Sequence, residues 1–124
     1  MQDESKIWLT IKFSDPNADA EELDKEVQSL LNQMKCMSEI ELAKPVSDPN
    51  PPTDGKGGGF LLGMLTAEVN LTNIKTLFRF LVDRLGNKVI ELEVEANGKK
   101  LKVKASSREE LEAAIQEAQK FISV

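Results

Sequence analysis

The sequence contains no histidine and no tyrosine, and Cys36 is its single cysteine. Without histidine the chain lacks the commonest general base, the commonest metal ligand and the side chain that titrates near neutral pH. One cysteine cannot form an internal disulfide, which fits a reducing compartment, and a reactive thiolate usually needs a histidine or another basic neighbour. We therefore expect a cytoplasmic protein that is not an enzyme, with no catalytic residue, no metal site and no cofactor.

Long hydrophobic runs and positive charge are also scarce. Residues 60–85 form a long, largely apolar segment, but Glu68 and Lys75 interrupt it near its centre, whereas a membrane span needs about 20 mostly apolar residues. The first residues, MQDESKIWLTIKF, begin acidic, so we expect no secretory signal peptide. With 16 Lys and Arg against 21 Asp and Glu, the net charge is −5, which argues against nucleic acid or an anionic membrane as a partner.

The residues that are present suit one domain spanning residues 1–124, and the chain opens with a strand. Residues 6–13, KIWLTIKF, alternate between apolar and polar positions, which is typical of a half-buried strand. Trp8 then faces outward, where an exposed tryptophan would be a good interface anchor. Four residues share the buried side: Ile7, Leu9, Ile11 and Phe13.

A helix and a second strand follow, which completes a β-α-β unit. Acidic residues precede apolar residues at helical spacing, and together they predict a helix over residues 20–35. Residues 38–46, SEIELAKPV, alternate again and predict a strand, with Ile40 and Leu42 facing inward and Pro45 limiting its length.

The clearest local pattern is a hairpin around Asn97-Gly98, the preferred dipeptide of two-residue type I′ turns. The turn predicts three apolar pairs on one face: Val94–Leu101, Leu92–Val103 and Ile90–Ala105. It predicts three opposite-charge pairs on the other: Glu95–Lys100, Glu93–Lys102 and Glu91–Lys104. Because each glutamate has a lysine opposite, we interpret them as a solvated charge ladder and not as a metal or acid–base cluster. A final amphipathic helix follows, with Ser107 and Glu110 as its capping box.

Proline and glycine are concentrated in residues 47–59, which predicts a mobile loop. Lys56 precedes Gly57, Gly58 and Gly59, so the GxxxxGK[ST] order of a phosphate-binding P-loop is missing. Free amides in a glycine run before a helix can still bind an anion. Lys56 and the three glycines are therefore a candidate anion site, with a flexible linker as the simpler interpretation.

Residues 60–69 are apolar on all sides at first, and the sequence allows either a short helix or an extra strand there. We favour the helix, followed by a second, core-facing helix over residues 72–85 that ends at a capping glycine, Gly86. The apolar run either extends the core or forms a surface for a second copy or another protein. The candidate interaction surface joins Trp8 to this run: Phe60, Leu61, Leu62, Met64 and Leu65.

These elements predict an α+β fold in the order β-α-β-loop-α-β-β-α. The expected architecture is a two-layer sandwich, in which a four-stranded sheet carries its helices on one face.

The order of segments resembles the effector-associated constant component family of bacterial conflict systems. The resemblance rests on KIWLTIKF, DPNADAEELDKEVQSLLNQM and SEIELAKPV, then GGGFLLGML, IKTLFRFLVDRLG and the hairpin IELEVEANGKKLKVKAS with the last helix. Members that carry an arginine-rich end of the middle helix with a tryptophan differ from this chain, which has FRFLVDRLG there, with Arg79 and Arg84.

The resemblance implies a small accessory protein that couples a sensing event to an effector such as a peptidase or an NTPase. We therefore expect a protein partner, with a second copy of the chain as another candidate. The alternative hypothesis is a regulatory domain that binds a small ligand or nucleotide through the glycine-rich loop.

Overall fold

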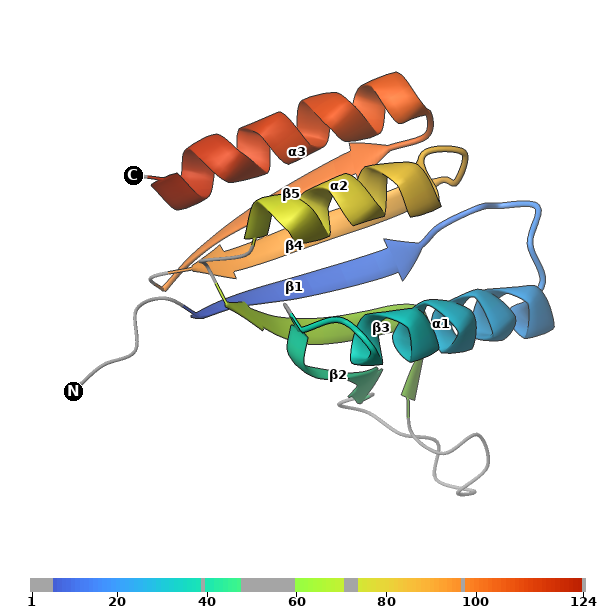
Figure 1. Ribbon diagram of the computed structural model, residues 1–124. Coiled ribbons are helices and arrows are strands. Elements are labelled where there is room, and N and C mark those ends of the chain that lie inside the picture. Colours follow the sequence, from blue (N-terminus) through green and yellow to red (C-terminus); the bar gives the residue numbers. More distant parts are fainter. Residues whose placement is uncertain (1–5, 39, 48–59, 71–73, 97, 124) are drawn as a thin grey trace.

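The computed structural model describes residues 6–38, 40–47, 60–70, 74–96 and 98–123 (Figure 1). Along this part of the chain lie β1 (Lys6–Phe13), α1 (Ala20–Lys35), β2 (Ile40–Ser47), β3 (Phe60–Asn70), α2 (Ile74–Leu85), β4 (Ile90–Ala96), β5 (Lys99–Ala105) and α3 (Arg108–Ser123). The strands form one antiparallel sheet in the order β2-β3-β1-β4-β5. The α+β class is confirmed, but the sheet has five strands instead of the expected four.

The additional strand is β3, so the favoured helix over residues 60–69 is wrong. β3 lies inside the sheet, hydrogen-bonded to β2 on one side and to β1 on the other. Its second half has the period of a strand, because Leu65, Ala67 and Val69 are fully buried while Thr66 and Glu68 face the other side. Pairing on both sides decided the structure of a segment whose local pattern was ambiguous.

β3 also changes how the β-α-β unit is built. β1 and β2 are both antiparallel to β3, so they run parallel to each other with β3 between them. The predicted strand–helix–strand unit therefore exists, but its two strands are not neighbours. The space that α1 spans is filled by a strand from later in the chain (Figure 1).

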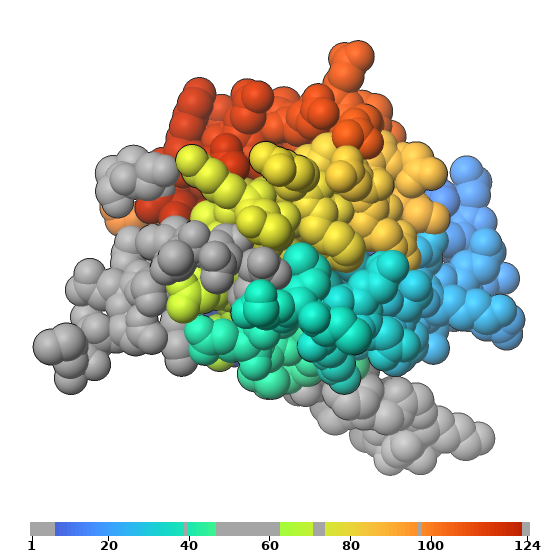
Figure 2. Space-filling model, viewed as in Figure 1, coloured from blue at the N-terminus to red at the C-terminus, as the bar shows by residue number. Residues whose placement is uncertain are grey.

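The three helices lie side by side on one face of the sheet, as predicted (Figure 1). Figure 2 shows that face, with α3, α2 and α1 forming a continuous layer. The core lies between this layer and the sheet and consists of buried apolar side chains from both. The largest of the fully buried ones, less than 2% exposed, are Phe78, Ile7, Leu9, Ile11, Leu30, Leu31, Met34, Leu65, Leu77, Leu81, Leu85 and Ile90.

Both helix starts near the chain ends are capped by side chains. α1 has the predicted bounds, and it begins with a capping box in which Asp19 accepts from the Glu22 amide and Glu22 accepts from the Asp19 amide. At α3 the box is only half formed. The Ser107 hydroxyl accepts from the Glu110 amide at 3.2 Å, but the Glu110 carboxylate accepts from the hydroxyl and amide of Ser106, both at 2.7 Å. The hydroxyl bond first, then the amide bond, lower the pKa of Glu110.

The predicted inward position of Leu42 is wrong, because β2 contains a bulge. Ile40 pairs with Val69 and Leu42 pairs with Glu68, so one extra residue, Glu41, is inserted between them. The alternation therefore shifts by one position after Ile40. Leu42 faces away from the helices, and the neighbouring Ala43 is buried in its place.

The hairpin register is confirmed at every predicted pair, from Val94–Leu101 to Glu91–Lys104. Ala96 pairs with Lys99, so Asn97-Gly98 is the two-residue loop, and Gly98 has a φ of +77°, as such turns require. Asn97 lies outside the described residues, so the type I′ geometry stays a prediction.

α2 ends at Leu85 as predicted, but Gly86 follows it for a different reason. The backbone of Gly86 does not have the positive φ of a capping glycine. Glycine is needed because a Cβ there would lie 2.7 Å from the carbonyl oxygen of Val82 and 3.2 Å from Cγ of Arg108. Residues 48–59 and 71–73 lie outside the described part, and with them the predicted mobile loop and the candidate anion site at Lys56, Gly57, Gly58 and Gly59.

Candidate functional site

In the described part of the chain no helix covers the second face of the sheet, and we call it the open face. Its outward side chains follow from the strand register, because directly opposite residues of neighbouring strands point to the same side. They form three rows across the sheet. The rows are Leu42–Glu68–Trp8–Glu95–Lys100, then Lys44–Thr66–Thr10–Glu93–Lys102, then Met64–Lys12–Glu91–Lys104.

Two large apolar side chains are exposed on the open face, in the same row. Trp8 is 36% exposed and Leu42 is 42% exposed, and these are the exposed large hydrophobic residues of the described part of the chain. Both are paired with Glu68, Trp8 from β1 and Leu42 from β2. The outward position of Trp8 was predicted from the alternation of β1. Leu42 was missed, since nothing in the sequence marks the bulge at Glu41.

The rest of the predicted interaction surface divides into three parts. Met64 is half-buried on the open face, two rows from Trp8. Leu65 is fully buried under the helices, so it belongs to the core and to no surface. Phe60, Leu61 and Leu62 belong to β3 through their backbone, and their side chains lie outside the described part.

Charge on the open face is arranged differently from a simple ladder. Lys100 is opposite Glu95, yet its Nζ lies 3.9 Å from Oε2 of Glu93, one row away. In the described residues this is the one ion pair within 4 Å between β4 and β5. The strand register is as predicted, but the three predicted ion pairs between directly opposite residues are not formed. A small hollow of about 110 Å³ lies beside them, lined by Thr10, Lys12, Met64, Glu91, Leu92, Glu93 and Lys102.

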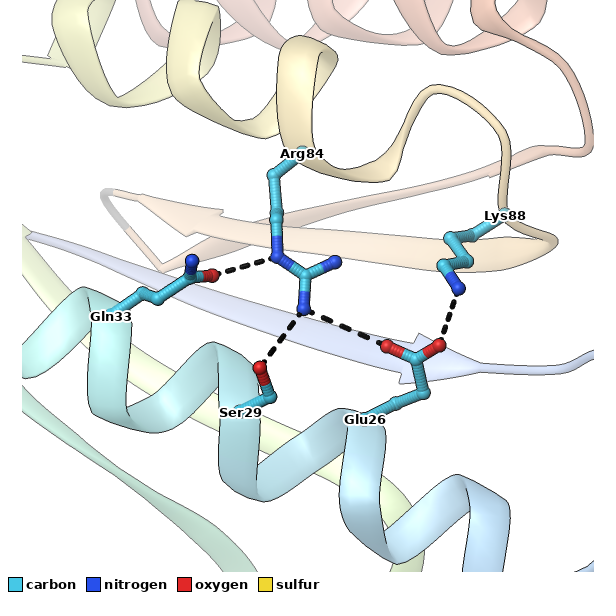
Figure 3. A network of polar contacts seen from close by, with 5 residues as sticks. All are labelled: Glu26, Ser29, Gln33, Arg84 and Lys88. Atoms are coloured by element: carbon cyan, nitrogen blue, oxygen red, sulfur yellow. Dashed lines mark hydrogen bonds and ion pairs between the residues drawn. The ribbon is translucent and has the colours of Figure 1, made fainter.

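On the helix side, most of the lysine and arginine side chains form ion pairs with carboxylates of the same chain. Arg84, at the end of α2, reaches α1 and donates from Nε to Gln33 at 2.7 Å and from Nη2 to Ser29 at 3.2 Å (Figure 3). Its Nη2 also lies 3.7 Å from Glu26, which pairs through its other oxygen with Lys88. The arginine at the end of the middle helix therefore joins two helices and is not available as a contact surface.

A shallow groove of about 510 Å³ separates α2 from α3. Phe78, Val82 and Ile115 line it and are themselves buried. On its rim Arg108 donates to Asp83 at 2.9 Å, and this bond raises the pKa of the arginine further. Arg108 also lies 3.5 Å from Glu112, so the carboxylates of the rim are engaged within the chain, and the apolar residues of the groove are buried.

The remaining candidates give no second site. Cys36 is exposed at the end of α1, and its amide donates to the carbonyl of Gln33 at 3.2 Å. Across the described ranges, no three cysteine or carboxylate side chains are grouped to bind a metal ion. None of the helices described is long and apolar enough to cross a lipid bilayer.

No protein-family model matches the chain, and no curated protein and no solved structure matches it either.

Proposed function

We propose that the protein is a non-enzymatic accessory component that binds a protein partner through the open face of its sheet. The observation that supports this most directly is the exposure of Trp8 and Leu42 in one row of that face. Tryptophan is enriched among the residues that contribute most to binding energy at interfaces. The absence of histidine from the sequence supports the non-enzymatic part of the proposal.

The charges of the open face favour a partner other than a second copy. Two copies that stack with aligned strands and place Trp8 over Trp8 are related by a twofold axis along β1 or by one across the strands at Trp8. The axis along β1 places Glu95 of one copy over Glu68 of the other. The axis across the strands places Glu95 of the two copies over each other and Lys100 of the two copies over each other. Either arrangement brings like charges together, which costs free energy.

The role of the partner comes from the resemblance to effector-associated constant components. On that basis the partner is an effector such as a peptidase or an NTPase, and the protein couples a sensing event to it. A strand-based surface on a rigid sheet suits this role, because it presents Trp8 and Leu42 in a fixed geometry.

Site-specific photocrosslinking tests the proposal. A benzophenone amino acid replaces Leu42 on the open face, and in matched control variants it replaces Gln28 of α1 or Gln116 of α3, both exposed on the helix side. In the cells that make the protein, we expect a crosslinked effector from position 42 and not from positions 28 and 116. Equal crosslinking from the helix positions, or none from position 42, would contradict the proposed function.

A further inference from the structure

Trp8 lies between two carboxylates on the open face. In the register of the sheet it is directly opposite Glu68 of β3 on one side and Glu95 of β4 on the other. Directly opposite residues of antiparallel strands have their Cβ atoms about 4.5–5.5 Å apart, within reach of long side chains. The exposed indole therefore has a carboxylate side chain on each side.

The cation that would ordinarily neutralise Glu95 is directed elsewhere. Lys100 is opposite Glu95 on β5, but its Nζ pairs with Glu93 at 3.9 Å. Within the described residues Glu95 has no ion pair within 4 Å. One carboxylate beside the indole is thus left for a group from outside the chain.

This combination selects the charge of a bound group. The face of an indole attracts cations through its quadrupole, and carboxylates accept hydrogen bonds from a guanidinium in a planar, often bidentate geometry. Bases of a nucleic acid also stack on tryptophan, but their phosphates would be repelled by Glu95. The net charge of −5 acts in the same direction over longer distances, because it attracts a basic partner.

We infer that Trp8 and Glu95, with Glu68 on the other side, form an anchor site for an arginine side chain of the protein partner. The inference rests on the proposed function, since it names the chemistry that the open face recognises. Leu42, beyond Glu68 in the same row, contacts an apolar residue next to that arginine.

The probe is a short peptide, acetyl-Leu-Gly-Arg-Gly-Leu-amide, compared with the same peptide carrying citrulline, which keeps the shape of arginine without its charge. Trp8 is the single tryptophan in a chain without tyrosine, so its fluorescence and its indole N–H resonance report on this site alone. We expect a saturable change with the arginine peptide at millimolar concentration, and binding at least about threefold weaker with citrulline.

Glu95→Gln and Glu91→Gln are the matched variants, because both glutamates face outward from β4 and only Glu95 is opposite Trp8. We expect Glu95→Gln to weaken binding of the arginine peptide by at least about threefold, and Glu91→Gln to leave it unchanged. Three results would each overturn the inference: equal responses to arginine and citrulline, no response up to about 10 mM, or tighter binding of a glutamate peptide.

Failure of this site is distinguishable from failure of the proposed function. If the peptides do not discriminate while position 42 still gives the specific crosslink, the open face binds a partner by other contacts. If the crosslink is absent, the proposed function itself fails.

Discussion

Glu110 shows how one side chain makes stability depend on pH at the start of α3. Its carboxylate accepts from the hydroxyl and the amide of Ser106, and these bonds favour the ionised form, so its folded pKa is below its unfolded value. A group with a lowered pKa stabilises the fold above its unfolded pKa, 4.5, and loses this contribution as pH falls below that value.

Ser106→Ala removes the hydroxyl bond, so we expect the variant to unfold more easily than the parent at pH 7. The difference in the free energy of unfolding should shrink as pH falls below 4.5 and through the lowered pKa of the folded parent, because the carboxyl then becomes protonated in both proteins. Urea denaturation at pH 7 and pH 3 measures it. Ser107→Ala is the control, since its lost bond goes to an amide and not to an ionised group. A Ser106 difference that stays constant with pH would contradict the prediction.

Gly63 in β3 is subject to two constraints, a positive φ and a close contact, whereas Gly98 has only the positive φ. Both have positive φ, +73° and +77°, which costs an alanine about 1–2 kcal/mol. A Cβ at Gly63 would also lie 3.2 Å from the carbonyl oxygen of Phe13, whereas the space around Gly98 is open. We therefore expect Gly63→Ala to lower the free energy of unfolding by about 1–3 kcal/mol and by more than Gly98→Ala does. Urea denaturation of both variants decides it, and an equal or larger loss at Gly98 would refute the role of the close contact.

Among the elements, α1 and α2 are joined by one polar network, from Arg84 to Gln33, Ser29 and Glu26 (Figure 3). The side chains of the Arg84–Glu26 pair are only 21% and 27% exposed, so water compensates incompletely for its loss. We expect Arg84→Met to lower the free energy of unfolding by about 1–2 kcal/mol.

Arg79→Met is the matched control on the same helix, because Arg79 is exposed and has no ion pair in the described residues. We expect it to change stability by less than about 0.5 kcal/mol. Chemical denaturation of the two variants under the same conditions compares them. Equal effects on the free energy of unfolding would mean that the polar network of Arg84 contributes nothing measurable to stability.

The two edge strands, β2 and β5, carry residues that protect them against pairing with a strand of another molecule. β5 carries lysines at four of its outward or terminal positions, Lys99, Lys100, Lys102 and Lys104, and β2 contains Pro45. Charge and proline at an edge discourage pairing with a strand of another molecule. The open face is therefore a more suitable surface for a partner than the sheet edges.

Elements with a complete local signal were predictable from the sequence. α1 and the β4–β5 hairpin have their capping, turn and periodic residues together, and both were found with correct bounds or register. β3 was missed because Phe60 to Met64 is apolar at every position except Gly63, which hides the period of a strand. Its identity depends on β1 and β2, which pair with it from elsewhere in the sequence.

The candidate site was predictable only where alternation is uninterrupted. Trp8 follows the regular pattern of β1, so its outward position could be inferred. Leu42 follows a bulge at Glu41, and one inserted residue reverses every later position. The placement of Glu68 and Glu95 beside Trp8 required the order of the strands, which no local pattern encodes.

At the scale of the whole molecule, the charges of the open face predict the state of association. Because stacking two copies with Trp8 over Trp8 opposes glutamates or lysines, we expect a monomer of 13.8 kDa. Light scattering over a range of concentrations measures the mass. A dimer that Trp8→Ala converts to a monomer would show that a second copy occupies the open face, and the partner would then have to bind elsewhere.

The strand order also determines when the molecule can fold. β1 emerges first from the ribosome, but its two neighbours, β3 and β4, are encoded from residue 60 onward. A nascent chain that ends before β3 contains β1, α1 and β2 but lacks the strand that pairs with both β1 and β2. Contacts between distant segments slow folding, because the loop must close before the contact forms. Until β3 is synthesised, the apolar sides of β1 and α1 cannot be buried in a complete core. A chaperone is therefore most useful at this stage.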